Sequence, residues 1–344
     1  MKALIMKNPG VFVMEEREMP VPKKGEVLLK INQAGICGTD LHAFEGTQPL
    51  YTYPRVSGHE LSATIAGFSS LSGGIDGLKE GDAVSVLPYL SCGSCAACRQ
   101  GKTNCCINIS VLGVHVDGGL QEYMVLPVEY AIPAGKVNAQ DIVLVECFSI
   151  GFHGVRRAEP KAKDIALVIG AGPIGIGVIH GLKQHDVTII VMDINEKRLT
   201  YAKDIAGAGY CINSREVDPL KALSGICGNE LPSLVIDATG NAGQMMKAFD
   251  YVSAAGKIVY VGLVRQDISF SDPLFHTKEI TLLASRNATK EDFTSVLCAM
   301  ESGRLNTDNF ITHRSVLENA PGEFPKWIKP ETGCIKAVVT VAGS

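Results

Sequence analysis

The sequence lacks the features that mark membrane-spanning, secreted or nucleic-acid-binding proteins. No uninterrupted apolar run reaches the ~18 residues that a membrane-spanning helix needs. The opening segment, MKALIMKNPGVFVMEE, has neither the long apolar core nor the cleavage site of a signal peptide, so we expect a cytoplasmic protein. No basic tract is present and the net charge is −4, which argues against nucleic acid or an anionic membrane as a partner.

The composition is that of a folded protein with more than one domain. A chain of 344 residues with 46% hydrophobic and 20% charged residues is too long for one ordinary core and too apolar for disorder. No internal repeat or low-complexity segment is evident. In a reducing compartment, the eleven cysteines are expected to be metal ligands or buried thiols rather than disulfides.

The pattern of apolar segments changes once along the chain. Up to about residue 145, short β-like runs at 27–31, 60–67, 83–87 and 121–126 are broken by Gly, Pro and Asp, which predicts an irregular, mainly β domain. From about residue 161, near-continuous apolar strands alternate with helical stretches, which predicts a parallel sheet covered on both faces. A final strand-like segment, IKAVVTV, is expected to return to the β domain.

A glycine motif follows the first strand of the α/β region. The strand IALVIG leads into G-A-G-P-I-G at 170–175, and this G-x-G-x-x-G includes Pro173 and Ile174 at the start of a helix. Gly170 would permit the tight turn, Gly172 the approach of a pyrophosphate, and Gly175 close packing of helix on strand. The helix N-terminus would bind the anion through its free N–H groups.

A carboxylate stands where the motif needs one for a dinucleotide. The second strand, TIIVMD, ends at Asp193, about 20 residues on, where an acid binds the hydroxyls of the adenosine ribose. Because this carboxylate would repel a 2′-phosphate, we expect NAD rather than NADP. Arg198 follows, and two roles stay open for it: holding adenine, or lying on a solvated helix face.

Regularly spaced cysteines predict a closed metal site. Cys92, Cys95, Cys98 and Cys106 form C-x2-C-x2-C-x7-C in a loop rich in small residues. Four thiolates can bind one tetrahedral zinc and leave no open position, so this site is expected to be structural. Cys105 is the alternative to Cys106 as the fourth ligand.

A second, mixed set of ligand residues occurs earlier in the chain. Cys37 lies in G-I-C-G-T-D, and His59 and Glu60 lie in S-G-H-E. Cysteine, histidine and a carboxylate together are typical of a catalytic zinc site. Taken singly, each has an ordinary alternative: a buried thiol, a core histidine and a surface charge.

Together these segments resemble the medium-chain, zinc-dependent alcohol and polyol dehydrogenase family. GICGTDLH, the GHE sequence, the four-cysteine loop, VLVECFSIGFH and GAGPIG occur in that family's order and approximate spacing, over essentially the whole chain. The resemblance implies an α/β protein in which a Rossmann domain is inserted into a mainly β, GroES-like catalytic domain. It implies domain boundaries of 1–147 and 286–344 for the catalytic domain and 148–285 for the NAD-binding domain.

The resemblance also assigns the catalytic zinc. It implies that Cys37 and His59 are ligands, that Glu146 in V-E-C-F-S holds the position of a further ligand, and that Glu60 can ligate directly or exchange with water. Polyol-type members usually have proline after the glutamate, whereas this chain has Cys147. The resemblance therefore leaves open which glutamate ligates the metal.

The implied reaction is zinc-assisted transfer of hydride from an alcohol to NAD. The resemblance implies one catalytic and one structural zinc per chain. The catalytic zinc would make the substrate hydroxyl acidic enough to lose its proton. Thr39 and His42 resemble the family's proton relay, and a histidine with an ordinary pKa near 6.5 can accept a proton at neutral pH. Their alternatives are a turn-capping threonine and a surface histidine.

Longer segments resemble bacterial oxidoreductases of sugar-acid catabolism, the L-galactonate oxidoreductase and starvation-sensing group. They are YPRVSGHE, VLGVHVDGGLQEY, FSDPLFHTKE, SRNATKEDF and ITHR. The resemblance implies oxidation of the C5 hydroxyl of a hexonate, L-gulonate or L-galactonate. Such a substrate needs an anion partner, and Arg286 could bind either its carboxylate or the cofactor pyrophosphate. His115 is a candidate substrate contact, or an ordinary loop histidine.

Three alternatives remain beside the hexonate dehydrogenase. One is a polyol or secondary-alcohol dehydrogenase of the sorbitol or threonine type. Another is a non-catalytic zinc- and NAD-binding relative, which the surviving ligands and relay pair disfavour. A zinc-free quinone reductase is disfavoured by Cys37 and the four-cysteine loop. The family further implies a homodimer or homotetramer, in which the strand KIVYVGL would lie at the interface or be internal.

Overall fold

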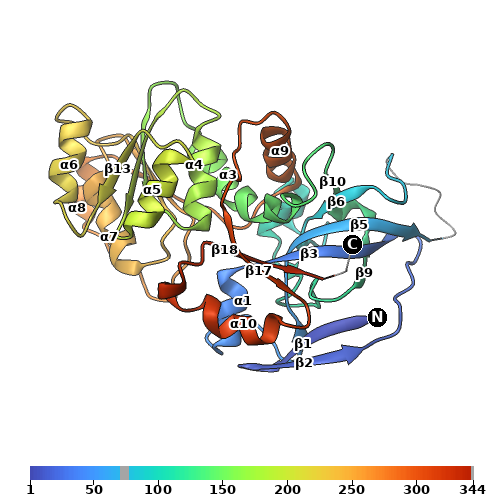
Figure 1. Ribbon diagram of the computed structural model, residues 1–344. Coiled ribbons are helices and arrows are strands. Elements are labelled where there is room, and N and C mark those ends of the chain that lie inside the picture. Colours follow the sequence, from blue (N-terminus) through green and yellow to red (C-terminus); the bar gives the residue numbers. More distant parts are fainter. Residues whose placement is uncertain (70–76, 342–344) are drawn as a thin grey trace. The chain divides into compact units, whose positions relative to one another are not determined.

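The computed structural model describes residues 1–69 and 77–341, which form two compact units (Figure 1). The first unit comprises 1–146, 289–301 and 307–344, and the second comprises 147–288 and 302–306. Strands from both ends of the sequence, blue and red in Figure 1, therefore belong to the same unit. Within the described ranges, no helix is long and apolar enough to cross a membrane.

The first unit is built mainly from antiparallel strands. Its largest sheet has the order β10-β6-β5-β3-β18-β17, and β9 also pairs with β3. A smaller sheet has the order β2-β1-β4, and β7 pairs with β8. The strands are β1 (Lys2–Asn8), β2 (Val11–Glu16), β3 (Glu26–Ile36), β4 (Arg55–Val56), β5 (Glu60–Phe68), β6 (Ala83–Val86), β7 (Tyr89–Leu90), β8 (Ser110–Val111), β9 (Tyr123–Pro127), β10 (Ala131–Pro133), β17 (Ile311–Val316) and β18 (Lys336–Thr340).

Short helices connect these strands. They are α1 (Gly38–Phe44), α2 (Ala96–Arg99), α9 (Lys290–Glu301), α10 (Ala320–Trp327) and the 3-10 turns η1 (Thr103–Cys105), η2 (Val128–Tyr130), η3 (Ile142–Leu144) and η4 (Pro330–Thr332). In β3, alternate residues such as Val27, Leu29 and Ile31 are fully buried, the period of two that places one face of a strand on a core. The segment IKAVVTV forms β18, which pairs with β3 as expected.

The second unit contains a parallel sheet of six strands among the residues described, in the order β13-β12-β11-β14-β15-β16. This is the strand order 3-2-1-4-5-6 of a dinucleotide-binding fold. The strands are β11 (Ile165–Ile169), β12 (Thr188–Asp193), β13 (Tyr210–Asn213), β14 (Leu234–Asp237), β15 (Lys257–Tyr260) and β16 (Thr281–Ala284). The helices are α3 (Val145–Ala158), α4 (Pro173–Leu182), α5 (Glu196–Asp204), α6 (Pro219–Ile226), α7 (Ala242–Tyr251) and α8 (Asp272–Thr277). Because α3 begins at Val145, its first residues belong to the first unit.

The expected alternation of strands and helices is confirmed, and the central strands β11 and β14 are almost entirely buried. Helices α3 and α4 pack closely where Gly151 meets Gly177. A Cβ on Gly151 would lie only 2.3 Å from the Gly177 carbonyl carbon, so a larger residue would not fit there. The segment KIVYVGL contributes β15, which lies between β14 and β16 and is therefore internal to the sheet.

Candidate active site

The segment that carries Cys37 lies at a strand-to-helix junction. β3 ends at Ile36, Cys37 caps α1 with φ −88° and ψ 158°, and the helix begins at Gly38. The fully buried Asp40 accepts a hydrogen bond from the Cys37 backbone N–H at 2.9 Å and another from the Gly58 N–H at 3.3 Å. One carboxylate thus fastens the Cys37 turn to the segment that precedes His59.

His59 is buried among acidic and thiol groups. Its side chain forms a hydrogen bond with Cys37, and Nδ1 lies 3.9 Å from Asp40 Oδ1 without a hydrogen-bond partner. Burial opposes the charged ring, but Asp40, Cys37 and Glu146 outweigh it and raise the pKa of His59 well above its ordinary value. A carboxylate next to a histidine is the arrangement that orients imidazole ligands in metal sites.

Glycines of a neighbouring loop contact the backbone that precedes His59. A Cβ on Gly118 would lie 2.2 Å from the Gly58 carbonyl oxygen, and one on Gly113 would lie 2.7 Å from the Gly58 nitrogen. The loop donates three backbone hydrogen bonds of 2.7–2.9 Å to the carbonyls of 56–58. The segment VLGVHVDGGL is therefore a backbone support for His59.

Glu60 is paired with a lysine from the far end of the chain. Lys336 Nζ lies 2.6 Å from Oε1 and 2.7 Å from Oε2 of Glu60, and both side chains are buried. Lys336 also donates to the Ile36 carbonyl. Gly35, the register partner of Glu60 in β5, leaves room for this carboxylate, since a Cβ there would lie 2.2 Å from Glu60 Oε2.

Glu146, in the first turn of α3, has a different partner. The buried Tyr89 hydroxyl donates a hydrogen bond to Glu146 Oε1. Burial raises the pKa of Glu146 to about 7, with a further contribution from Glu60, although His59 and Tyr89 favour the carboxylate. Cys147 is buried beside it.

These residues fit a zinc ion chemically. Cys37 offers a thiolate, Glu146 a carboxylate and His59 a buried nitrogen without a hydrogen bond, which are the donor types of catalytic zinc. They do not form a closed cage: within 1–69 and 77–341, only the four-cysteine group brings three or more ligand atoms within 4.8 Å of one another. Glu146 is turned to Tyr89, and Glu60 to Lys336.

The four-cysteine group has the expected membership. Cys92, Cys95, Cys98 and Cys106 place their sulfur atoms within 4.8 Å of one another, whereas Cys105 is exposed and outside the group. Cys106 Sγ accepts backbone hydrogen bonds from Cys92 and Asn108, each 3.3 Å long. Hydrogen bonds from Ser94 and neighbouring groups lower the pKa of Cys92 to about 6, which favours the thiolate that binds zinc.

The predicted relay residues lie on α1. Thr39 is half-buried and His42 is exposed, one turn apart in the helix. His42 Nδ1 lies 3.4 Å from Thr47 Oγ1 and 3.4 Å from Glu45 Oε2. Their place at the helix that begins beside Cys37 is compatible with a relay, and their role stays a prediction.

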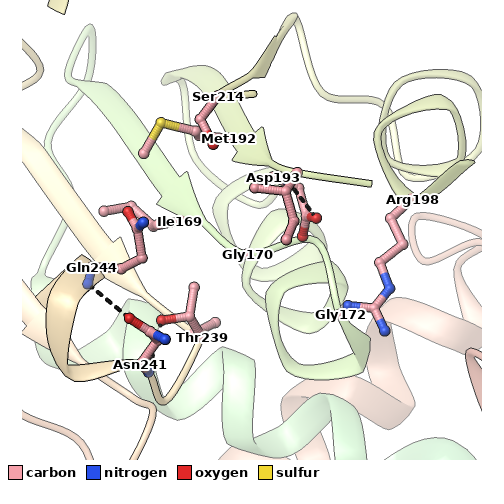
Figure 2. A pocket seen from close by; sticks show the side chains of 12 residues that line it. Ile169, Gly170, Gly172, Met192, Asp193, Arg198, Ser214, Thr239, Asn241 and Gln244 are labelled. Atoms are coloured by element: carbon pink, nitrogen blue, oxygen red, sulfur yellow. Dashed lines mark hydrogen bonds between the residues drawn. The ribbon is translucent and has the colours of Figure 1, made fainter. Parts of the chain in front are cut away.

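A pocket of about 270 Å³ opens at the carboxyl ends of the parallel strands in the second unit (Figure 2). The glycine motif behaves as expected there: Gly170 has φ 95°, and a Cβ on Gly175 would lie 1.8 Å from the Gly170 carbonyl oxygen. Pro173 is the first residue of α4, followed by Ile174. The pocket is lined by Ile169, Gly170, Gly172, Met192, Asp193, Ile194, Arg198, Ser214, Ala238, Thr239, Asn241 and Gln244.

Asp193 and Arg198 both line this pocket, and their contact with a cofactor stays a prediction. Asp193 accepts backbone hydrogen bonds from Ala171, Ile194 and Asn195 at 2.7–2.8 Å, so its carboxylate is fixed at the end of β12. Figure 2 shows Arg198 reaching toward Gly172, where its Nη1 lies 3.8 Å from a Cβ built on the glycine.

Sequence reasoning missed four polar residues that line the pocket, Ser214, Thr239, Asn241 and Gln244. The available signal was their position, since each follows the carboxyl end of a parallel strand, where ligands bind in such sheets. Asp40, Tyr89 and Lys336 were also missed. Of these, only Asp40 had a local signal, as the acidic residue three positions after a helix cap.

The two candidate substrate residues are not brought together within one unit. His115 belongs to the first unit, where its Nδ1 accepts a hydrogen bond from the Val111 N–H at 3.0 Å and closes a turn. Arg286 belongs to the second unit, where it is exposed just after β16. Contact of either residue with a substrate stays a prediction.

Fold and site define a class of protein, and comparison with known sequences agrees. Residues 23–136 match the alcohol dehydrogenase GroES-like domain, and residues 173–302 match the zinc-binding dehydrogenase domain. The chain belongs to the zinc-binding alcohol dehydrogenase family. It is accordingly an oxidoreductase of the medium-chain type that works with zinc and a nicotinamide cofactor.

Among individual proteins, the chain is 40% identical to L-galactonate-5-dehydrogenase of Escherichia coli K12 over 340 residues, 99% of each chain. It is 34% identical to the starvation-sensing protein RspB of the same strain, again over 99% of each. The structure of the rspB alcohol dehydrogenase from Escherichia coli CFT073, complexed with NADH, has a TM-score of 0.91 with 32% identity and covers 99% of both chains.

Proposed function

We propose that this enzyme oxidises the C5 hydroxyl of a hexonate to a ketone with NAD as the acceptor. L-Galactonate and L-gulonate are the two candidate substrates, giving D-tagaturonate and D-fructuronate. The observation that carries the proposal is the 40% identity to L-galactonate-5-dehydrogenase along the entire length of both chains. The 34% identity to RspB supports the same subgroup of the family.

The site residues have the roles that this oxidation requires. Cys37, His59 and Glu146 would hold the catalytic zinc, and the four-cysteine group would hold the structural one. When bound, zinc supplies a Lewis acid that makes a hydroxyl more acidic, and NAD supplies the hydride acceptor. Thr39 and His42 would carry the hydroxyl proton to solvent, toward which the exposed His42 side chain faces.

The pocket in the second unit favours NAD over NADP. The Asp193 carboxylate is held by three backbone N–H groups at the end of β12, the position from which an acid binds the adenosine ribose. A 2′-phosphate at that point would meet a like charge. Arg198, beside Gly172, would contact the adenosine or pyrophosphate part of the same cofactor.

The substrate carboxylate needs a cationic partner. Arg286 remains the candidate for it or for the pyrophosphate, because a guanidinium binds either anion in a bidentate way. His115 remains a candidate contact for a hydroxyl group of the substrate. Lys336 is not a candidate for binding the substrate carboxylate, because its ammonium group forms a salt bridge with Glu60.

A substrate screen tests the proposal. Purified enzyme is given L-galactonate, L-gulonate, L-idonate, sorbitol and L-threonine, each with NAD or NADP, while absorbance of the reduced cofactor is followed. We expect turnover of at least one of the first two hexonates with NAD and a much lower kcat/KM for the uncharged polyol and for NADP. Absence of turnover with every hexonate would contradict the proposal.

A second candidate is a polyol or amino-alcohol dehydrogenase. It is favoured by 30% identity to a sorbitol dehydrogenase of Halalkalibacterium halodurans and 32% to an L-threonine 3-dehydrogenase of Pyrococcus furiosus, each over at least 90% of the chain. This candidate expects turnover of sorbitol or threonine in the same screen without any hexonate activity.

We further propose that the enzyme is a homodimer or homotetramer. β15 is covered by neighbours on both sides, so KIVYVGL offers no free edge for pairing between copies. β16 is at the end of the strand order instead, and its Thr-Leu-Leu-Ala sequence is only partly buried. An edge strand of this kind can pair with another chain.

A further inference from the structure

Two buried glutamates, Glu60 and Glu146, lie in the candidate catalytic site, and their partners differ in charge. Both oxygens of Glu60 lie within 2.7 Å of the Lys336 ammonium. Glu146 instead accepts a hydrogen bond from a neutral phenol, through Oε1 only. The Lys336 ammonium neutralises the Glu60 carboxylate. Tyr89 is uncharged, so the negative charge of Glu146 remains available to a cation.

The surroundings hold these partners in place. Lys336 is fixed by its place in β18 and by the Ile36 carbonyl, so that separating it from Glu60 would leave a buried ammonium without its counter-ion. Tyr89 is 4% exposed and lies in β7, where it pairs with Val111 of β8. Its ring is therefore anchored by a strand, and its hydroxyl fixes the orientation of Glu146.

We propose that Tyr89 is a positioning residue that orients the Glu146 carboxylate for the proposed catalytic zinc. The hydrogen bond occupies Oε1 and leaves Oε2 for the metal, whereas both oxygens of Glu60 are paired with Lys336. This inference rests on the proposed catalytic zinc with Glu146 as a ligand, and goes beyond it by naming the group that orients Glu146. Partners of this kind typically change metal affinity by about 10–100-fold.

The test uses the full chain and measures metal binding directly. Tyr89→Phe keeps the ring and removes only the hydroxyl, and Glu146→Gln removes the negative charge at nearly constant volume. Zinc content, zinc affinity by chelator competition, and the absorption spectrum of the cobalt-substituted protein are measured for each. Tyr260→Phe is the matched control, because its hydroxyl donates to the Met245 carbonyl within the second unit, whereas the residues of both metal groups belong to the first.

We expect Tyr89→Phe to weaken binding of the proposed catalytic zinc by about 10–100-fold and to shift the cobalt spectrum, while the cysteine-bound zinc is retained. Glu146→Gln should do the same more strongly, and Tyr260→Phe should do neither. The inference is overturned if Tyr89→Phe or Glu146→Gln binds both metals with the affinity and cobalt spectrum of the unaltered enzyme. An unaltered protein that holds only the cysteine-bound zinc would overturn the catalytic zinc itself, and this inference with it.

Discussion

The two groups of candidate zinc ligands are built in opposite ways. The four cysteines lie within 92–106 and are joined by local backbone turns, with sulfur atoms within 4.8 Å of one another. Cys37, His59 and Glu146 come from three separate segments, of which His59 and Glu146 are buried and Cys37 is half-buried, together with the buried Asp40, Tyr89 and Lys336. The four-cysteine group can be recognised from the spacing of its residues alone. The group of Cys37, His59 and Glu146 comes together only when the entire first unit is folded.

Two of the buried histidines, His59 and His180, show what such surroundings do. His59 has carboxylates and a thiol nearby, which raise its pKa despite burial. His180, on α4 in the second unit, is fully buried against the Phe148 ring, and burial, with Lys183 nearby, lowers its pKa to about 4. Burial opposes charge in both, so the companions decide whether a histidine is functional or part of a core.

The largest effect on activity is expected from altering the group of Cys37, His59 and Glu146. Cys37→Ser removes a thiolate from the proposed catalytic zinc, and since a metal contributes several kcal/mol to the stabilisation of developing charge, kcat should fall by about 10³-fold or more. NAD affinity, measured by fluorescence titration, should change little because the cofactor pocket lies in the other unit. Cys298→Ser, an exposed cysteine on α9, is the control. Equal loss of activity and NAD binding would show that Cys37 supports the fold instead.

Altering the four-cysteine group should affect the stability of the protein more than its catalytic activity. Cys95→Ser is expected to lower the zinc content by one atom per chain and the free energy of unfolding by about 3 kcal/mol, the scale for opening a cross-linked loop of this length. Thermal unfolding should shift downward by roughly 5–10 °C. Cys105→Ser, next to the group but outside it, should leave both quantities unchanged. A shift of similar size in Cys105→Ser would mean that the fourth ligand has been misassigned.

The smallest effect concerns His180 and depends on pH. Its folded-state pKa of about 4 lies below the unfolded value near 6.5, so the unfolded chain binds the extra proton between these values. Stability should therefore fall as pH drops below about 6.5, by about 2 kcal/mol between pH 7 and 5, and level off below pH 4. In urea unfolding, the His180→Phe variant should lack this pH-dependent part of the free energy of unfolding. The variant His185→Gln, at an exposed position, should retain it. Identical pH dependence in all three proteins would contradict the assignment.

Much of the second unit could be predicted from the sequence because its signals are local. The glycine motif, the strand ending at Asp193 and the alternation of strands and helices all follow from residues close together in the chain. The cysteine group is predictable for the same reason. Lys336 and Glu60, by contrast, are separated by 276 positions, and no pattern around either residue indicates the other.

The ligand choice at the catalytic site could not be predicted for this reason. The sequence offers two glutamates of equal chemistry, and what distinguishes them is an ammonium beside Glu60 and a phenol beside Glu146. Both partners arrive through strand pairing, Lys336 in β18 and Tyr89 in β7. The identity of each partner is visible only once the sheet register is known.

The contact between Gly58 and the two glycines Gly113 and Gly118 has a consequence for how this enzyme can diverge. Since main chain meets main chain there, neither partner can be enlarged without displacing the turn that precedes His59. The backbone position of the imidazole is thus set in part by atoms that all residues share, and an exchange of side chains at these three glycines cannot adjust it. We therefore expect new substrate preferences to arise at other positions around the site.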